Sequence, residues 1–177
     1  PGLKFGRLSL ARPMPVSRPG EAGRWLFIDV DASAWTIPDI PGDAQPDLFF
    51  DLPRHIANPG NTLALAFHPR FPAVPHVYVL YNRRGTNPGE DVLSRFDVTL
   101  SDPPRVDLAS EQVLQRWPSR GHDGGDLRFG PDGFLYVSVG DRSSPGDPNN
   151  LTQRLDIITG GILRLDVERS DPGKNYA

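Results

Sequence analysis

The segment Leu127-Arg128-Phe129-Gly130-Pro131-Asp132-Gly133, followed by Leu135-Tyr136-Val137, indicates how this chain folds. Two apolar runs joined by a Pro-Asp-Gly turn are typical of a β-hairpin. An earlier segment repeats the pattern, with Leu65-Ala66-Phe67-His68-Pro69-Arg70-Phe71 followed by Val77-Tyr78-Val79. The two phenylalanines are 62 positions apart (129 minus 67). Known periods of β-propeller blades are about 40–50 residues, so the repeat predicts one four-stranded blade with loop insertions.

Strand-sized apolar runs, separated by turn residues, continue along the rest of the chain. They are Trp25–Val30, Trp35–Ile37, Leu48–Leu52, Leu63–Phe67, Val77–Tyr81, Val92–Val98, Gly125–Phe129, Phe134–Val139 and Ile162–Val167. No run of a dozen residues keeps a helical period without Gly or Pro, although Asn150–Ile158 has room for a short helical turn. The pattern predicts an all-β fold.

The length of 177 residues corresponds to about three blades at that spacing. Closed propellers need about four to eight blades, and an open arc would leave two flanks uncovered. We therefore expect this chain to supply about three blades of a larger ring, with the remaining blades after Ala177 or in a part of the protein not given by this sequence. A complete β-sandwich is the alternative that strand number alone permits.

Composition excludes several classes of function. The formal net charge is −3, from 19 basic and 22 acidic residues, which does not favour nucleic acid as a partner. No stretch approaches the roughly 20 apolar residues of a membrane span, and the first residues do not look like a signal peptide. With no cysteine there is no disulfide, thiolate nucleophile or Cys-ligated metal, and redox usage leaves the compartment open.

The most specific segment is residues 121–141, GHDGGDLRFGPDGFLYVSVGD. Together with Ala66-Phe67-His68-Pro69 and Gly161-Ile162-Leu163-Arg164-Leu165-Asp166, it resembles the signature of the soluble glucose/sorbosone dehydrogenase family, which includes pyrroloquinoline quinone (PQQ)-dependent sugar dehydrogenases. The resemblance is specific between residues 121 and 166 and faint before residue 60. It implies a six-bladed β-propeller, of which residues 1–177 are the N-terminal portion of a single domain.

The resemblance also implies a catalytic pair. His122 matches the family's general base, which takes the proton of the anomeric hydroxyl while hydride passes from C1 of the sugar to the quinone. An imidazole suits this step because it is half-deprotonated near neutral pH. Asp141 matches the aspartate that orients this histidine. Gly124 and Gly125 would let the backbone approach the cofactor closely.

The expected function is therefore a PQQ- and calcium-dependent quinoprotein oxidoreductase acting on an aldose or a related sugar. In the family, the basic residues that hold the quinone and the calcium ligands lie beyond the segment matching Gly161–Asp166. We expect no metal ligands in this chain, which alone would be an inactive fragment. The resemblance further implies a cytochrome or another electron acceptor as partner, and a periplasmic or secreted location.

Two departures from the family pattern keep other functions open. Pro59 stands where dehydrogenases place Gln or Glu near the cofactor, although Asn61 offers a nearby amide. Arg142-Ser143-Ser144 replaces glycines after Asp141, which suggests a reshaped entrance. These departures favour a non-catalytic extracellular β-propeller that binds a protein or carbohydrate ligand. A carbohydrate-binding β-sandwich is the third hypothesis, in which tryptophans stack on sugar rings; they are Trp25, Trp35 and Trp117.

Overall fold

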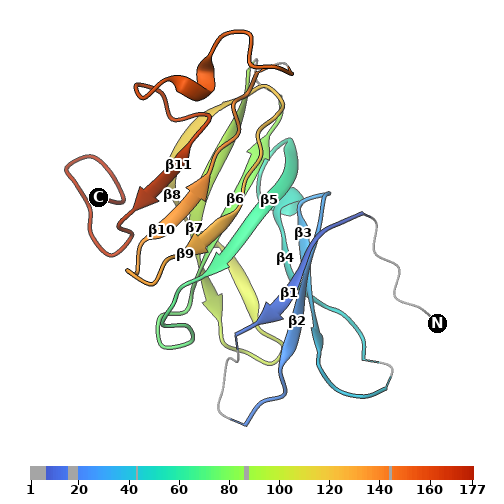
Figure 1. Cartoon of the computed structure of the whole chain (residues 1–177). Coiled ribbons are helices and arrows are strands. Elements are labelled where there is room, and N and C mark those ends of the chain that lie inside the picture. Colours follow the sequence, from blue (N-terminus) through green and yellow to red (C-terminus); the bar gives the residue numbers. More distant parts are fainter. Residues whose placement is uncertain (1–6, 16–19, 43, 86–87, 144) are drawn as a thin grey trace.

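The chain forms three antiparallel sheets that follow one another along the sequence (Figure 1). The computed structural model describes residues 7–177 except 16–19, 43, 86–87 and 144. The first sheet contains β1 (Leu8–Met14), β2 (Arg24–Asp29), β3 (Ser33–Pro38) and β4 (Asp47–Asp51). The second contains β5 (Pro59–Phe67), β6 (His76–Arg83), β7 (Gly89–Thr99) and β8 (Arg105–Ser119). The third contains β9 (Leu127–Phe129), β10 (Leu135–Ser138) and β11 (Ile162–Leu165). Two 3₁₀ turns, η1 (Leu52–Arg54) and η2 (Leu151–Gln153), are the only helical elements in these described ranges.

The middle sheet packs against a hydrophobic core on each face, which is the arrangement of stacked propeller blades. Successive residues of β6 alternate between two cores. Val77 and Val79 pack with residues of the first sheet, whereas Tyr78 and Leu80 pack with residues of the third. A strand buried on both faces reads as a continuous apolar run, because side chains alternate between the two faces.

The first strands of the three sheets lie side by side at the inner edge of the arc (Figure 1). β5 contacts both β1 and β9. Arg12 of β1 bridges them, since one guanidinium nitrogen donates a hydrogen bond to the Leu65 carbonyl oxygen over 2.8 Å and the other lies 3.5 Å from Asp126 Oδ1. This bridge holds three blades together near their common axis.

The observed architecture confirms the predicted all-β propeller and excludes the β-sandwich. Phe67 and Phe129, the two phenylalanines of the repeat, each end the inner strand of a blade. The predicted hairpin joins β9 to β10, with Gly133 at φ +83°, as its turn requires. A sandwich needs two sheets enclosing one core, whereas here the middle sheet contributes to two cores.

Some strand predictions were wrong. The sequence did not predict β1 or β8, because polar residues alternate with apolar ones in both strands. In β8, RVDLASEQVLQRWPS, one face of the strand is partly exposed. The run Gly125–Phe129 is a strand only from Leu127, because Gly125 has φ +134°, outside the β region. The helical turn expected within Asn150–Ile158 is the single 3₁₀ turn η2.

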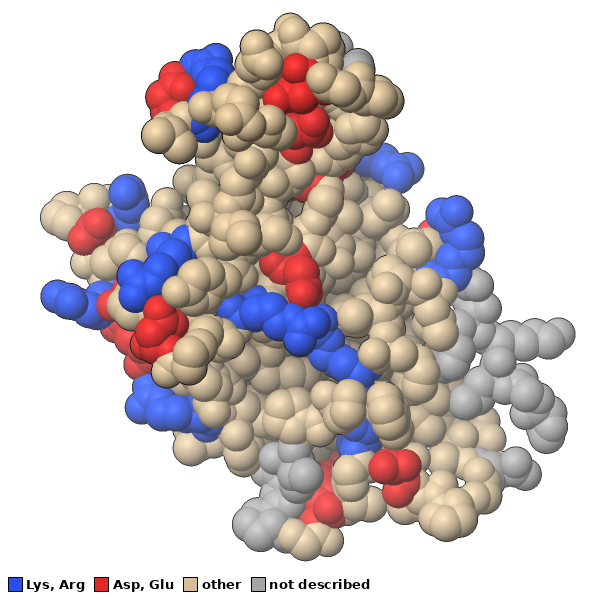
Figure 2. Space-filling model, in the orientation of Figure 1, with Lys and Arg blue, Asp and Glu red and all other residues tan. Residues whose placement is uncertain are grey.

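Acidic and basic side chains are interspersed over the face shown in Figure 2. Among the residues described, no helix is long and apolar enough to cross a membrane.

Candidate functional site

His122, the predicted base, lies on the loop that connects β8, at the outer edge of the second blade, with β9, the inner strand of the third. Gly121, Gly124 and Gly125 all have positive φ angles, and so does His122, at +49°. Positive φ is uncommon for a residue with a side chain and costs about 1–3 kcal/mol, so the surrounding contacts must impose it.

Gly140, at the end of β10, allows this loop to lie close to the third blade. A Cβ atom at Gly140 would stand 1.7 Å from the carbonyl oxygen of His122. The amide of Gly140 instead donates a hydrogen bond to the Asp123 carbonyl oxygen over 2.7 Å. Because the next residue along is Asp141, this backbone contact brings the histidine and the aspartate together.

His122 and Asp141 lie at ion-pair distance, with 3.5 Å between Nδ1 and Oδ1. The histidine side chain is 51% exposed and the aspartate side chain 19%. Asp141 Oδ1 also accepts a hydrogen bond from the Ser143 amide over 3.1 Å. Among the residues described, nothing hydrogen-bonds to Nε2 of His122. The arrangement therefore has one ring nitrogen beside a fixed carboxylate and the other open to a ligand.

Gly124 and Gly125 pack against protein. A Cβ at Gly125 would meet Leu80 Cδ2 at 2.7 Å, and a Cβ at Gly124 would meet Gly140 at 3.3 Å. Close packing of the loop on the second and third blades is thus sufficient reason for both glycines. Their contact with a cofactor stays a prediction.

A buried carboxyl group, Asp91 of β7, is also close to the loop, and sequence reasoning missed it. Asp91 is 0% exposed, and neither of its oxygens has a hydrogen bond of good geometry among the residues described, although the indole of Trp117, opposite it on β8, is a donor close enough to lower its pKa. Burial raises the pKa of Asp91 to about 7, and the nearby Asp123 carboxylate adds to the rise, whereas Trp117 and Arg142 oppose it. An aspartate preceding an apolar run gives no sign in the sequence that it will be covered.

The residues that depart from the family pattern have defined places. The Nε of Arg142 is shielded from solvent, and this side chain lies close enough to Asp91 to influence its pKa. Pro59 begins β5 and pairs with Arg83. Asn61 lines a cavity of about 370 Å³ together with Gly121 and Asp123, the two neighbours of His122. Ser144 lies outside the described residues.

Asp147 and Trp117 have structural roles in the second and third blades. Asp147 accepts hydrogen bonds from the Leu151 amide and from the amide and hydroxyl of Thr152, so it stabilises a turn. Those hydroxyl and amide contacts lower its pKa. Trp117 is buried and Trp25 is 40% exposed on the flank of the first sheet. Within the described ranges, no three His, Asp or Glu side chains converge as metal ligands.

Curated relatives at the sequence level are hedgehog-interacting proteins. Those of Homo sapiens and Mus musculus are 30% identical over 173 residues, which is 90% of this chain and 25% of each relative. The HIPL1 protein of Arabidopsis thaliana is 37% identical over 75 residues, which is 40% of this chain and 11% of that protein. The chain thus spans at most about a quarter of these three relatives.

Similar solved structures are described as dehydrogenases. One, from Thermus thermophilus, is assigned as an oxidoreductase of the glucose dehydrogenase type; it has a TM-score of 0.61 and 26% identity, over 87% of this chain and 47% of that one. Another is the PQQ-bound aldose sugar dehydrogenase of Streptomyces coelicolor, with a TM-score of 0.64 and 20% identity, over 98% of this chain and 52% of that one. The likeness to the second shows the fold alone.

The family model described as glucose/sorbosone dehydrogenase matches residues 51–176, which include the second and third blades, His122 and Asp141. This match covers most of the chain and agrees with the predicted resemblance. The chain belongs to the glucose/sorbosone dehydrogenase family and forms part of its β-propeller.

Proposed function

We propose that the complete protein is a PQQ-dependent oxidoreductase that oxidises an aldose or a related sugar, with His122 as general base. The observation that carries this proposal is the His122–Asp141 pair, 3.5 Å apart on a loop that the packing of Gly140 fixes in place. Membership of the glucose/sorbosone dehydrogenase family supports the same reaction class. In this proposal residues 1–177 are the N-terminal portion of one propeller domain.

The two residues have different proposed roles. Nε2 of His122 is free to accept the proton of the sugar's anomeric hydroxyl. Asp141 beside Nδ1 holds the proton on that nitrogen, which selects the tautomer in which Nε2 is the acceptor, and it stabilises the imidazolium that forms. General-base catalysis of this kind contributes about 10²–10⁴-fold in rate.

The residues of this chain relate differently to the two proposed cofactors, PQQ and calcium. When bound, PQQ would accept the hydride from C1 of the sugar. The open Nε2 of half-exposed His122 is the proton acceptor that such a reaction needs from this part of the propeller. Among the described residues, no three His, Asp or Glu side chains converge on one point. By the family resemblance, we propose that the calcium ligands lie in other blades.

The test is reconstitution of the complete protein with PQQ and Ca²⁺, followed by dye reduction with a panel of aldoses. We expect sugar-dependent reduction that falls by about 10²–10⁴-fold in His122→Gln. His55→Gln is the matched control, since His55 pairs with Glu111 elsewhere on the second blade. Absence of sugar-dependent reduction, or full activity in His122→Gln, would refute the proposal.

A non-catalytic binding propeller is the second candidate. It is favoured by the 30% identity to hedgehog-interacting proteins over nearly the whole chain, and by Pro59 in place of a side-chain amide or acid. Calorimetry of the complete protein with PQQ separates the two candidates. Tight one-to-one binding supports the oxidoreductase, and no binding supports the second candidate.

The proposed oxidoreductase also needs an electron acceptor and a compartment. By its family, we propose a cytochrome or similar acceptor and a periplasmic or secreted location. Fractionation of the source cells, followed by reduction assays with candidate cytochromes, tests both.

A further inference from the structure

The cavity beside the His122 loop has a marked excess of positive charge. It lies at the ends of β6 and β8, has a volume of about 370 Å³, and is lined by Arg83, Arg84 and Arg120 among others. This volume is in the range of small-molecule sites, about 300–1,000 Å³. Asp123 is the single acidic residue among the described residues that line it. The chain as a whole has a net charge of −3, so the cavity differs in sign from the rest of the protein.

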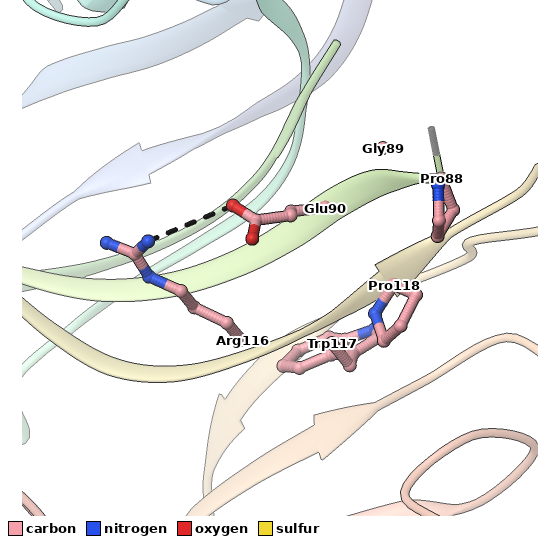
Figure 3. Close-up of a pocket in the computed structure, with 6 residues that line it drawn as sticks. All are labelled: Pro88, Gly89, Glu90, Arg116, Trp117 and Pro118. Carbon is pink, nitrogen blue, oxygen red and sulfur yellow. Dashed lines mark ion pairs between the residues drawn. The ribbon is translucent and has the colours of Figure 1, made fainter. Parts of the chain in front are cut away.

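Two acidic side chains near the cavity, those of Asp123 and Glu90, already have partners. Asp123 accepts hydrogen bonds from the Ser119 hydroxyl over 2.8 Å and from the Arg120 amide over 3.2 Å. Glu90 lies 3.8 Å from Arg83 and 3.8 Å from Arg116, and Figure 3 shows its carboxylate turned toward Arg116. Within the described parts of the chain, Arg84 and Arg120 have no carboxylate partner. Neither guanidinium group is therefore neutralised by a carboxylate within those parts.

The neutral wall of the cavity is preorganised. Asn82 is buried, and its Oδ1 accepts a hydrogen bond from the Asn61 amide over 2.6 Å. A Cβ at Gly60 would stand 1.7 Å from that same Oδ1, so glycine there allows the asparagine to approach. Arg84 reaches Asn61 Oδ1 at 3.5 Å. The cavity thus has asparagine amide groups that can hydrogen-bond to hydroxyl groups and guanidinium groups that can bind an anion.

This combination fits an acidic sugar. Guanidinium forks form two parallel hydrogen bonds with a carboxylate, and such charge-assisted bonds are about twice as strong as neutral ones. Asparagine side chains supply both donors and acceptors to hydroxyl groups. Gly121 and Asp123, the sequence neighbours of His122, line the cavity, whereas His122 is not among the described residues that line it.

We propose that this cavity binds the carboxylate of a sugar acid, such as a uronic acid, and that acidic sugars are the preferred substrates or ligands of this protein. As a statement about substrates this rests on the proposed function, but as a statement about binding it does not. The same carboxylate chemistry is present in the quinone cofactor, so the experiment must separate the two sources.

The experiment is calorimetry on the complete protein without PQQ, comparing glucuronate with glucose, and wild type with the Arg84→Gln/Arg120→Gln double variant. We expect wild type to bind glucuronate at least about tenfold more tightly than glucose, with affinity falling as salt increases. In the double variant we expect the affinity for glucuronate relative to glucose to fall by about 10- to 100-fold. Arg105→Gln is the matched control, because Arg105 is exposed at the opposite end of β8.

A second measurement, the affinity of each variant for PQQ, completes the test. Unchanged PQQ affinity in the double variant supports a sugar-acid site. Equal binding of glucuronate and glucose by wild type would overturn the proposal, as would a preference that survives in the double variant. Loss of PQQ affinity in the double variant would also overturn it, because the cavity would then hold the quinone. The two sugar-binding readouts require neither PQQ nor turnover, so failure of the proposed oxidation leaves them interpretable.

Discussion

At the scale of single residues, the site depends on groups held in unfavourable states. His122 has a positive φ angle, and Asp91 is a fully buried carboxyl group with a raised pKa. Both lie in or next to the loop between the second and third blades. Such features persist only where the surrounding structure imposes them, and they often accompany function.

Asp91 makes stability depend on pH. Burial raises its pKa from 3.8 to about 7, so the folded state retains a proton that the unfolded state loses. Its contribution is therefore favourable at low pH and is lost as pH rises from about 4 to about 7. We expect Asp91→Asn to gain roughly 1–3 kcal/mol of unfolding free energy over wild type between about pH 5 and pH 8. Denaturant unfolding of the complete protein at both pH values measures this.

The control for that prediction is Asp31→Asn, since Asp31 is exposed in a turn of the first sheet. Its difference from wild type should stay within about 0.5 kcal/mol at both pH values. A pH-independent difference between wild type and Asp91→Asn would show that Asp91 titrates alike in the folded and unfolded protein.

At the scale of elements, the segment that follows β10 lies in close contact with the loop before β9 at Gly140. We predict that Gly140→Ala lowers sugar-dependent turnover of the reconstituted protein about 100-fold, because its Cβ would collide with the His122 carbonyl group and displace the base. Gly161→Ala is the control: an added Cβ there meets nothing within 4 Å. If both variants keep wild-type turnover, the loop does not need this close approach.

The sequence allowed the hairpin of the third blade and the inner strand ending at Phe67 to be predicted, because apolar runs and Pro-Gly turns mark them directly. It also identified the pairing of His122 with Asp141 through the family resemblance. It did not allow β8 or the burial of Asp91 to be predicted. Both depend on which face of a strand the neighbouring blade covers, and this is set by contacts distant in sequence.

At the scale of the whole molecule, the three blades are joined at their inner edge by Arg12. Burial lowers the pKa of Arg12, whereas Asp126 opposes that effect. We predict that Arg12→Met lowers the unfolding free energy by about 1–3 kcal/mol, because it removes the hydrogen bond to the Leu65 carbonyl group and an ion pair between blades. Chemical denaturation of the complete protein measures the loss.

Arg128→Met is the matched control, since Arg128 pairs with the same Asp126 from an exposed position, with 71% of its side chain accessible. We expect its effect to stay below about 1 kcal/mol. An equal loss in both variants would mean that Arg12 contributes no more than a surface ion pair.

The central claim is that His122 faces the substrate with Asp141 behind it. The most direct measurement is a crystal structure of the complete protein with a bound sugar. We expect Nε2 of His122 at about 3 Å from the anomeric hydroxyl oxygen, within hydrogen-bond reach, with Nδ1 still beside Asp141. A sugar bound elsewhere on the propeller, or a His122 ring turned away from Asp141 in that complex, would contradict it.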